Sequence, residues 1–510
     1  MDNWLSPLEG SAYVTKGKAM TTPISLMTGE HTDIYVDGEL RPAHSSARIP
    51  VVNPADELEF ATIPNGDKHD VSAAVDAARA AFRNSGWPQL PPSQRAHYLR
   101  RLARAIEDRA EQLGAVVTAQ IGMPLVSSVQ SNGSGTSKFY RYYAELADQL
   151  EVESERIGHE LRTVIRREPV GVAGLIVPWN GPQGAIAWKL APALAAGCTT
   201  VVKPAPEASL DSYLLAEALG EAGIPPGVVN IVFGARETGA LVASHPGVDK
   251  VSFTGSTHAG RQVALACAKR FARVTLELGG KSAALLLEDV DLDTFLPLVA
   301  PACIPFSGQI CHALTRVLAP RARYDEVVEG IANKVAGLVV GHPLNPATQV
   351  GPLVAKRQRV RVEEYIASGC VQGAKVVTGG RRPQGLDVGY YLEPTVFRDV
   401  DTSMRIAQEE IFGPVVSVIP YHNEEEAIAI CNGTTYGLGG AVFTSDPERG
   451  MAIARRVEAG VVGINRYALH IDAPFGGVKE SGLGRELGPE GLAAFLEIKS
   501  IFPAQRSSAV

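Results

Sequence analysis

Short apolar runs alternate with segments of helical periodicity between residues 168 and 280. The apolar runs predict strands at Val170–Val177, Thr199–Val202, Val228–Phe233, Val248–Phe253 and Val274–Leu278. The intervening segments predict helices at Ala185–Ala196, Leu210–Ala222, Glu237–Ser244 and His258–Arg270. Strands and helices that alternate in this way form βαβ units, so we expect a parallel sheet covered by helices on both faces. Ligands of such sheets bind where the strands end.

The pattern changes on either side of this region. Before it, apolar residues at helical spacing predict helices at Val71–Phe82 and Ala96–Leu113. After it, a second α/β region runs from about Ser282 to Phe475. The elements predicted there are helices at Tyr324–Val339 and Val354–Ser368 and strands near Val415–Ile419 and Val461–Ile464. Because 510 residues exceed what one hydrophobic core usually serves, we expect an α/β fold with at least two domains.

Two segments have a peripheral character. Residues 1–32 are irregular and rich in Thr, Ser and Gly, which favours a tail or a docking arm. Glu151–Arg167 alternates loosely between apolar and polar residues. This alternation predicts exposed strands that pair with another subunit.

Charge and composition narrow the class of protein. A net charge of −7 gives no support for binding to nucleic acid or to an acidic membrane, since both require clustered positive charge. No secretory signal is visible, and the most apolar segment, Ala185–Val202, is interrupted by Lys189 and Pro192. The six cysteines lack CxxC spacing and a matching histidine cluster, so we expect reduced cytoplasmic thiols and no metal site.

Four loops contain candidate chemistry. Pro178–Asn180 follows a predicted strand and, taken alone, is best interpreted as a turn. Gly255–Gly260 lies between a strand and a helix, where glycines and a helix N-terminus suit a pyrophosphate, although such a glycine pair is weak evidence. Glu277 is an acid inside an apolar strand, for which function and a satisfied ion pair are about equally favoured. Cys311 follows a glycine-containing loop, and a small buried apolar residue is the default interpretation of any single cysteine.

Together these loops belong to a series of motifs that resembles the aldehyde dehydrogenase superfamily. The motifs occur in the family's order: VPWN at Val177–Asn180, WKLAPALAAG at Trp188–Gly197, FTGST at Phe253–Thr257, LELGGK at Leu276–Lys281, GQxC at Gly308–Cys311, EEIFGPV at Glu409–Val415 and PFGGxKxSGxGRE at Pro474–Glu486. The resemblance extends from about Asp33 to Phe502, nearly the whole chain.

The resemblance implies a fold and a division of the chain. A parallel-sheet, NAD-binding domain would comprise residues 33–147 and 166–280, and an α/β catalytic domain residues 281–482. Residues 148–165 and 483–510 would form a small β extension for oligomerisation, with residues 1–32 as the tail. Members of the family are homodimers or homotetramers, so we expect one of these states.

The resemblance also implies catalytic roles for three residues. Cys311 matches the nucleophile, whose thiolate attacks the aldehyde carbon and forms a thioester after hydride loss. Asn180 matches the residue whose amide, with the Cys311 backbone N–H, holds the developing oxyanion. Glu277 matches the base that activates water to hydrolyse the thioester. Relatives that transfer the acyl group to coenzyme A usually lack this acid, so a free carboxylic acid is the expected product.

Lys203 matches the lysine that binds the adenosine ribose of the cofactor. Many NAD-using relatives have a glutamate three residues later, whereas this chain has Pro206 there and Glu207 one step further. An acid near the ribose would repel a 2′-phosphate, so NAD is the expected cofactor, with NADP as the alternative. The other residues implied in cofactor binding are Val177, Pro178, Trp179, Gly234, Phe253, Gly255, Ser256, Gly260, Leu278, Glu410 and Phe412. Lys189, Arg316 and Lys479 match positions that we assign to structure.

The expected substrate tunnel departs from the family pattern. Many relatives have an aromatic and large aliphatic residues after Asn180, but this chain has Gly181, Gly184 and Ala185. Small side chains suggest a wider tunnel and hence a bulky, mostly apolar aldehyde. The remaining residues expected on the wall are Trp188, Pro305, Ile310, His312, Tyr467, Leu469 and Phe475. We expect His312 to shape the pocket rather than to act as a base, because adjacent residues usually point apart.

Three alternatives remain open. A non-catalytic relative is opposed by the presence of Cys311, Glu277 and Asn180. The same cysteine could support an esterase or acyl-transfer activity without nicotinamide. A semialdehyde dehydrogenase would usually need Arg or Lys in the tunnel to bind the second carboxylate, and Arg466 keeps that possibility open.

Overall fold

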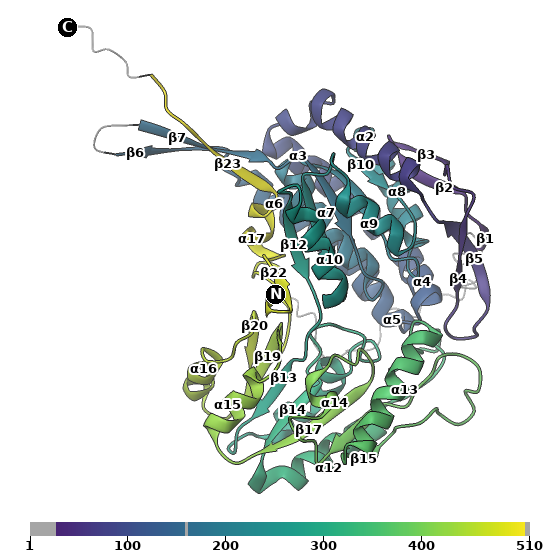
Figure 1. Cartoon of the computed structure of the whole chain (residues 1–510), viewed down its shortest axis with the longest axis vertical. Coiled ribbons are helices and arrows are strands. Elements are labelled where there is room, and N and C mark those ends of the chain that lie inside the picture. The colour runs from purple at the N-terminus through teal and green to yellow at the C-terminus, as the bar shows by residue number, and fades with distance from the viewer. Residues whose placement is uncertain (1–26, 159–161, 505–510) are drawn as a thin grey trace.

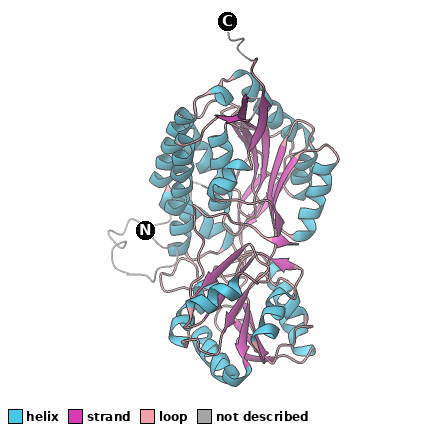
Figure 2. Ribbon diagram, turned by 90° about the vertical axis from the view of Figure 1, so that its left-hand side faces the viewer, coloured by secondary structure: helices cyan, strands magenta, loops and turns pink. Residues whose placement is uncertain are grey.

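The molecule consists of two α/β bodies and a projecting arm. The arm is formed by Glu153–Ile157, Arg162–Pro169 and Leu496–Ile501. The computed structural model describes residues 27–158 and 162–504. Figure 1 shows the larger body above the smaller one, with the arm extending from the larger body. Figure 2, turned by 90°, shows strands in the interior of each body and helices on both sides. The α/β architecture predicted from the sequence is therefore confirmed.

An eight-stranded sheet forms the centre of the larger body. Its order is β22-β12-β11-β8-β9-β10-β2-β3. The five neighbours from β12 to β10 are parallel, and β22, β2 and β3 add antiparallel edges. The strands are β2 (Asp33–Val36), β3 (Glu39–Pro42), β8 (Val172–Ile176), β9 (Thr199–Lys203), β10 (Val229–Ile231), β11 (Lys250–Thr254), β12 (Arg273–Glu277) and β22 (Gly482–Leu483). All five predicted parallel strands are present, with ends within a few residues of those expected.

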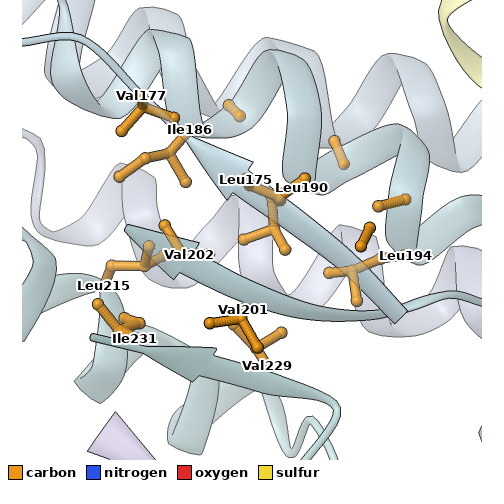
Figure 3. Packing of buried hydrophobic residues seen from close by; sticks show 14 of the residues in the cluster. Leu175, Val177, Ile186, Leu190, Leu194, Val201, Val202, Leu215, Val229 and Ile231 are labelled. Carbon is orange, nitrogen blue, oxygen red and sulfur yellow. The ribbon is translucent and has the colours of Figure 1, made fainter. Parts of the chain in front are cut away.

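Apolar side chains from strands and helices fill the space around this sheet. Figure 3 shows Leu175 of β8 beside Leu190 of helix α7 (Pro182–Ala196), with Val201 of β9 and Val229 of β10 on neighbouring strands. All four side chains are essentially inaccessible to solvent. Full burial of such residues stabilises a fold by about 1.5–3 kcal/mol each, and strands that are buried on both faces, as β8 and β9 are, need not alternate between apolar and polar residues.

Helices cover both faces of the eight-stranded sheet. They are α2 (Lys68–Asn84), α3 (Pro92–Asp108), α4 (Ala110–Ile121), α5 (Leu125–Ser128), α6 (Gly135–Asp148), α7 (Pro182–Ala196), α8 (Asp211–Ala222), α9 (Arg236–Ser244), α10 (Thr257–Ala268) and α17 (Gly488–Ala493). A π-helical turn at Val129–Ser134 joins α5 to α6.

The single helix predicted at Ala96–Leu113 is wrong. Arg109 leaves the helical conformation, with φ −103° and ψ 9°, and separates α3 from α4. Its guanidinium donates to the Ala105 carbonyl and to Glu221 of α8, at 3.0 and 2.8 Å. The apolar periodicity continues across the break, so the pattern alone did not reveal it.

The smaller body has a seven-stranded sheet in the order β15-β16-β17-β14-β13-β19-β20. All neighbours are parallel except β15 and β16. Its elements are β13 (Ala283–Leu286), β14 (Arg316–Pro320), β15 (Lys375–Thr378), β16 (Thr395–Arg398), β17 (Val415–Tyr421), β19 (Gly439–Phe443), β20 (Val461–Ile464), α11 (Leu292–Phe295), α12 (Tyr324–Ala336), α13 (Lys356–Val371), α14 (Arg405–Gln408), α15 (Glu424–Asn432) and α16 (Pro447–Ala454). The helices and strands predicted in this region are confirmed, although α12 ends three residues early.

Three small sheets complete the fold. The arm has the order β23-β7-β6, from Leu496–Ile501, Arg162–Pro169 and Glu153–Ile157, so the strands predicted within Glu151–Arg167 are confirmed. A second sheet joins β1 (Gly29–Glu30), β5 (Glu59–Pro64) and β4 (Arg48–Val52), and a third pairs β18 (Tyr436–Gly437) with β21 (Val478–Lys479). β1 lies within the predicted tail, whose residues 1–26 fall outside the described residues. Within the described part of the chain, no helix is both long and apolar enough to span a bilayer.

Candidate active site

The loop that carries Cys311 has an unusual backbone. Phe306, Ser307 and Gly308 have φ values of 44°, 54° and 73°, in the left-handed region that only glycine adopts readily. The Ser307 hydroxyl donates to the Gly351 carbonyl at 2.9 Å. A Cβ at Gly308 would lie 2.1 Å from the Gly413 carbonyl oxygen. Surrounding backbone therefore holds the loop in one conformation, a form of stored strain that is typical of functional sites.

Cys311 is half-buried at the end of this loop. Burial raises the pKa of its thiol well above the usual range, and the charges of Glu410 and Glu277 raise it further. Both carboxyl groups therefore act electrostatically on the sulfur. A thiol in this environment needs a positive charge nearby before it ionises near neutral pH.

Asn180 reaches the cysteine loop from the other body. It follows β8 and precedes α7, where parallel strands present their carboxyl ends. Its side-chain Nδ2 donates to the backbone carbonyl of Gln309 at 2.8 Å, two residues before Cys311. The amide is thus held against the segment that carries the thiol.

Glu277 is the last residue of β12 and is almost fully buried. In the part of the chain that the structure describes, neither of its carboxyl oxygens has a hydrogen-bond partner. Burial raises the pKa of Glu277 well above the usual range and the charge of Glu486 adds to this rise, against the opposing effects of Lys189 and Arg485. Gly476 passes so close that a Cβ there would lie 2.5 Å from Oε1. The alternative that Glu277 forms a satisfied ion pair does not hold here, and its carboxyl group is free to act as an acid or base.

A buried ion pair supports this carboxyl group. Lys189 of α7 pairs with Glu486, and both are shielded from water. The Lys189 ammonium also donates to Thr254 Oγ1 at 2.7 Å, and the Ser252 hydroxyl donates to Glu486 Oε1 at 2.9 Å. The structural role expected for Lys189 agrees with this contact. Glu486 was not singled out in the sequence, because its partner is 297 residues away and only the fold joins them.

The residues predicted for cofactor binding gather along one edge of the eight-stranded sheet. Most lie at or just after the carboxyl ends of adjacent parallel strands: Val177, Pro178 and Trp179 after β8, Lys203 at the end of β9, Gly234 after β10, Phe253, Gly255 and Ser256 at the end of β11, and Leu278 after β12. Gly260 of α10 packs against Leu278. Ser256 is the N-cap of α10, and its Oγ accepts from the Ala259 N–H at 3.3 Å. A helix N-terminus at such an edge favours a bound phosphate.

Glu410 and Phe412 approach this edge from the other body. Glu410 Oε1 accepts from the Gly280 N–H at 3.1 Å, and burial raises its pKa to about 7. The Phe412 ring meets Trp179 edge-on, with ring centres 5.4 Å apart. The two bodies therefore meet at the set of residues predicted to bind the cofactor.

Glu207 has a partner that the sequence did not indicate. Its carboxylate forms an ion pair with Arg357 in the first turn of α13. The structure thus places Glu207 between the strand edge with Lys203 and a helix of the smaller body.

Aromatic side chains line the region beside Cys311. Ring centres are 5.3 Å apart for Trp188 and Phe475, 5.9 Å for Phe475 and His312, and 5.6 Å for His312 and Tyr467. The Tyr467 hydroxyl donates to the His312 carbonyl at 2.8 Å. Burial lowers the pKa of His312 to about 4, so the imidazole is neutral at ordinary pH and too weak a base to compete with Glu277.

The remaining residues expected on the tunnel wall are partly buried. Ala185 and Leu469 pack against the same apolar cluster as Cys311, while Pro305 and Ile310 are half-buried on the cysteine loop. A Cβ at Gly181 would meet nothing within 4 Å, and one at Gly184 would meet only the Ser131 carbonyl, at 4.0 Å. The glycines therefore leave space. Arg466 is exposed.

Most of the chain has relatives of known class. Residues 41–501 match the profile of the aldehyde dehydrogenase family. The chain belongs to this family. The resemblance found in the sequence and the expected enzyme class, an oxidoreductase that acts on aldehydes, are thereby confirmed.

Among curated relatives, the chain is 48% identical to geranial dehydrogenase of Castellaniella defragrans, over 93% of this chain and 99% of the relative. It is 42% identical to 3-succinoylsemialdehyde-pyridine dehydrogenase of a Pseudomonas species, over 92% and 98% respectively.

Solved structures show the same fold. An aldehyde dehydrogenase of Mycobacterium tuberculosis complexed with NAD+ superimposes with a TM-score of 0.92 at 44% identity, covering 94% of this chain and all of that one. A mutant of aldehyde dehydrogenase C of Pseudomonas syringae, complexed with NAD+ and octanal, gives a TM-score of 0.90 at 42% identity, with coverage of 93% and 98%.

Proposed function

We propose that this enzyme oxidises a bulky, mostly apolar aldehyde to the carboxylic acid with NAD, through a thioester on Cys311. One observation carries the proposal: Glu277 has a buried carboxyl group without a hydrogen-bond partner among the described residues, and its charge acts on the Cys311 thiol. A nucleophile with a carboxyl group near enough for its charge to act on the sulfur is what thioester formation and hydrolysis require.

Each residue has a distinct task in this reaction. The Cys311 thiolate adds to the aldehyde carbon, and the Asn180 amide stabilises the oxygen as it becomes negative. Bound NAD supplies the acceptor for the hydride that leaves this carbon. Glu277 then takes a proton from water, the resulting hydroxide adds to the thioester carbon, and the carboxylic acid leaves as the Cys311 thiolate is restored.

The residues along the strand edge fit NAD. Lys203 is almost fully buried, and burial lowers its pKa to about 8. Among the described residues its ammonium has no hydrogen-bond partner, so it is available to a ribose hydroxyl. Ser256 and Gly255 begin α10 where a pyrophosphate would lie, and Glu410 offers carboxyl oxygens to a second ribose. Several solved relatives are NAD+ complexes, which supports the same assignment.

Replacing Asn180 by alanine is expected to lower kcat by about 10²- to 10³-fold, because one preorganised oxyanion donor contributes that much in comparable sites. The measurement is steady-state NADH formation with saturating aldehyde. The isosteric Asn180→Asp variant should lose activity as well, since it cannot donate the hydrogen bond. Unchanged kcat in both variants would exclude Asn180 from the oxyanion site.

The space at Gly181 and Gly184 and the ring of aromatic residues support a bulky apolar substrate. The relatives that act on geranial or bind octanal have apolar aldehydes as ligands, in agreement with this. The test is NADH and NADPH formation against aldehydes graded from acetaldehyde to long-chain, aromatic and terpenoid types. Highest kcat/KM for acetaldehyde would reject the substrate class, and no reduction of either cofactor would reject the function.

Filling this space should change substrate preference. We expect Gly184→Leu to lower kcat/KM for a branched terpenoid aldehyde by about 10- to 100-fold, since misfit of a few methylene groups has effects of this size. Activity with acetaldehyde should persist. Gly220→Leu is the matched control. Like Gly184, Gly220 lies in a helix, and a Cβ added to Gly220 would meet no atom within 4 Å. Equal losses for both aldehydes would show that Gly184 does not border the tunnel.

We also propose that the enzyme is a cytoplasmic homodimer or homotetramer. All six cysteines are free thiols, as expected for a reducing compartment. The arm projects from the larger body (Figure 1), and its strands expose Ile157, Ile498 and Ile501. Apolar side chains on an exposed sheet favour pairing with another subunit. Light scattering of the purified protein tests the oligomeric state, and fractionation of the source cells tests the location.

A further inference from the structure

The end of β9 carries two opposite charges. Lys203 lies at the strand end, and Glu207 follows after Pro206. The charge of Glu207 favours the ammonium form of Lys203, so the carboxylate acts on the group expected to bind the adenosine ribose. Proline occupies the position where many relatives have their ribose-binding acid, and it has no side chain that can accept a hydrogen bond. The nearest candidate for that task is Glu207.

Arg357 fixes the position of Glu207. The two side chains form an ion pair, in which 19% of the Glu207 side chain and 63% of the Arg357 side chain are exposed. Arg357 is in the first turn of α13, and the helix N-cap Ala355 packs in one apolar cluster with Ala208 and Trp179. The pair therefore joins the two bodies beside the residues expected at the adenosine side of the cofactor.

The three charges at this place respond differently to the two cofactors. NADP carries a 2′-phosphate with a charge near −2, whereas NAD has a neutral hydroxyl there. The Lys203 ammonium and the Arg357 guanidinium would together bind a phosphate well, since arginine is the preferred partner of phosphate oxygens. The Glu207 carboxylate pairs with the guanidinium, and its negative charge also acts on the Lys203 ammonium. Because Glu207 is mostly buried, solvent screens this charge only partly.

We propose that the Glu207–Arg357 ion pair is the element that selects NAD over NADP, an inference that rests on the proposed function. Glu207 takes over the selectivity of the acid missing at Pro206, and Arg357 holds the Glu207 carboxylate in place between α13 and the end of β9. Removal of the Glu207 carboxylate alone would leave the Lys203 ammonium and the Arg357 guanidinium without this negative charge. The two cations would then bind the 2′-phosphate.

The decisive measurement is binding of two cofactor fragments to the full-length protein by titration calorimetry. ADP represents the NAD side and 2′,5′-ADP the NADP side, and neither requires aldehyde oxidation. The unchanged protein should bind ADP more tightly. Glu207→Gln should shift the ratio of the two Kd values toward 2′,5′-ADP by at least about tenfold, as expected for one charge–charge interaction in a partly buried site. The NADP-to-NAD ratio of kcat/KM should shift in the same direction.

Variants of Arg357 distinguish a change in cofactor selectivity from a general disruption of the binding site. Arg357→Met alone should not improve 2′,5′-ADP binding, because the carboxylate remains, and the double variant should lose most of the gain seen with Glu207→Gln. Glu363→Gln is the matched control, since Glu363 lies further along α13 and pairs with Arg382, which is outside this helix. An unchanged Kd ratio in Glu207→Gln, or tighter binding of 2′,5′-ADP by the unchanged protein, would overturn the proposal. A protein that shows the expected Kd shift but oxidises no aldehyde would instead contradict the proposed function.

Discussion

Replacing Cys311 by alanine is expected to lower NADH formation by on the order of 10⁴-fold or more, because the variant has no atom that can form the covalent adduct. Without a thioester there is no intermediate for Glu277 to hydrolyse, so the loss should appear in kcat. Binding of NAD should persist, since the strand edge proposed to hold the cofactor is unchanged. Stopped-flow absorbance for NADH and calorimetric titration with NAD measure the two effects separately.

The other cysteines provide the controls for this experiment. Cys370→Ala should retain full activity, because Cys370 is exposed on α13. Alkylation of the Cys370→Ala variant, which lacks this exposed thiol, by iodoacetamide in the presence of NAD should inactivate it at a stoichiometry of one thiol per subunit. Substantial NADH formation by Cys311→Ala with any aldehyde would contradict the thioester mechanism, and a different nucleophile would have to be sought.

The second large effect is expected for Glu277→Gln. This variant can form the thioester but lacks the base that activates water, so a burst of NADH should be followed by a steady state about 10²- to 10⁴-fold slower. The burst itself should not slow, because the charge of Glu277 raises the pKa of Cys311 and its removal favours the thiolate. Rapid-mixing measurements of NADH with a good aldehyde substrate resolve the two phases.

The pH dependence follows from the raised pKa of Glu277. Below this pKa the carboxyl is protonated and cannot accept a proton from water, so the hydrolysis rate of the unchanged enzyme should rise with pH. The slow phase of Glu277→Gln should lose this dependence. Glu480→Gln, which removes an exposed glutamate paired with Arg261, should keep both the rate and the profile. A Glu277→Gln variant without a burst would place its effect before thioester formation.

Much of the fold could be predicted because local pattern and tertiary structure agree. The strands from β8 to β12 lie in short runs that are rich in apolar and β-branched residues, between segments of helical periodicity, so their positions were evident. Cys311 and Asn180 were identified by the motifs around them. The same motifs contain Glu277, and the structure adds that its carboxyl group is buried without a partner among the described residues.

The parts that could not be predicted depend on residues far apart in the chain. The helix break at Arg109 is accompanied by a contact with Glu221, which local periodicity does not report. The Lys189–Glu486 pair and the Glu207–Arg357 pair each join segments that only the folded chain brings together. Charge partners of this kind have no local sequence signal, although the first pair modifies the burial-raised pKa of Glu277 and the second pair holds Glu207 in position.

The pairing of β22 with β12 determines when the site can form during synthesis. Leu483 and Gly482 lie opposite Leu276 and Glu277, so the sheet edge beside the proposed catalytic base is completed by residues about 200 positions later in the chain. Glu486, the counter-ion of Lys189, follows directly. Domains generally fold as they leave the ribosome, beginning with the N-terminal parts. A nascent chain that still lacks these residues would have an uncompensated lysine in its core and an open strand at its future active site. The larger body therefore becomes a working enzyme only when the end of the chain folds back onto its middle.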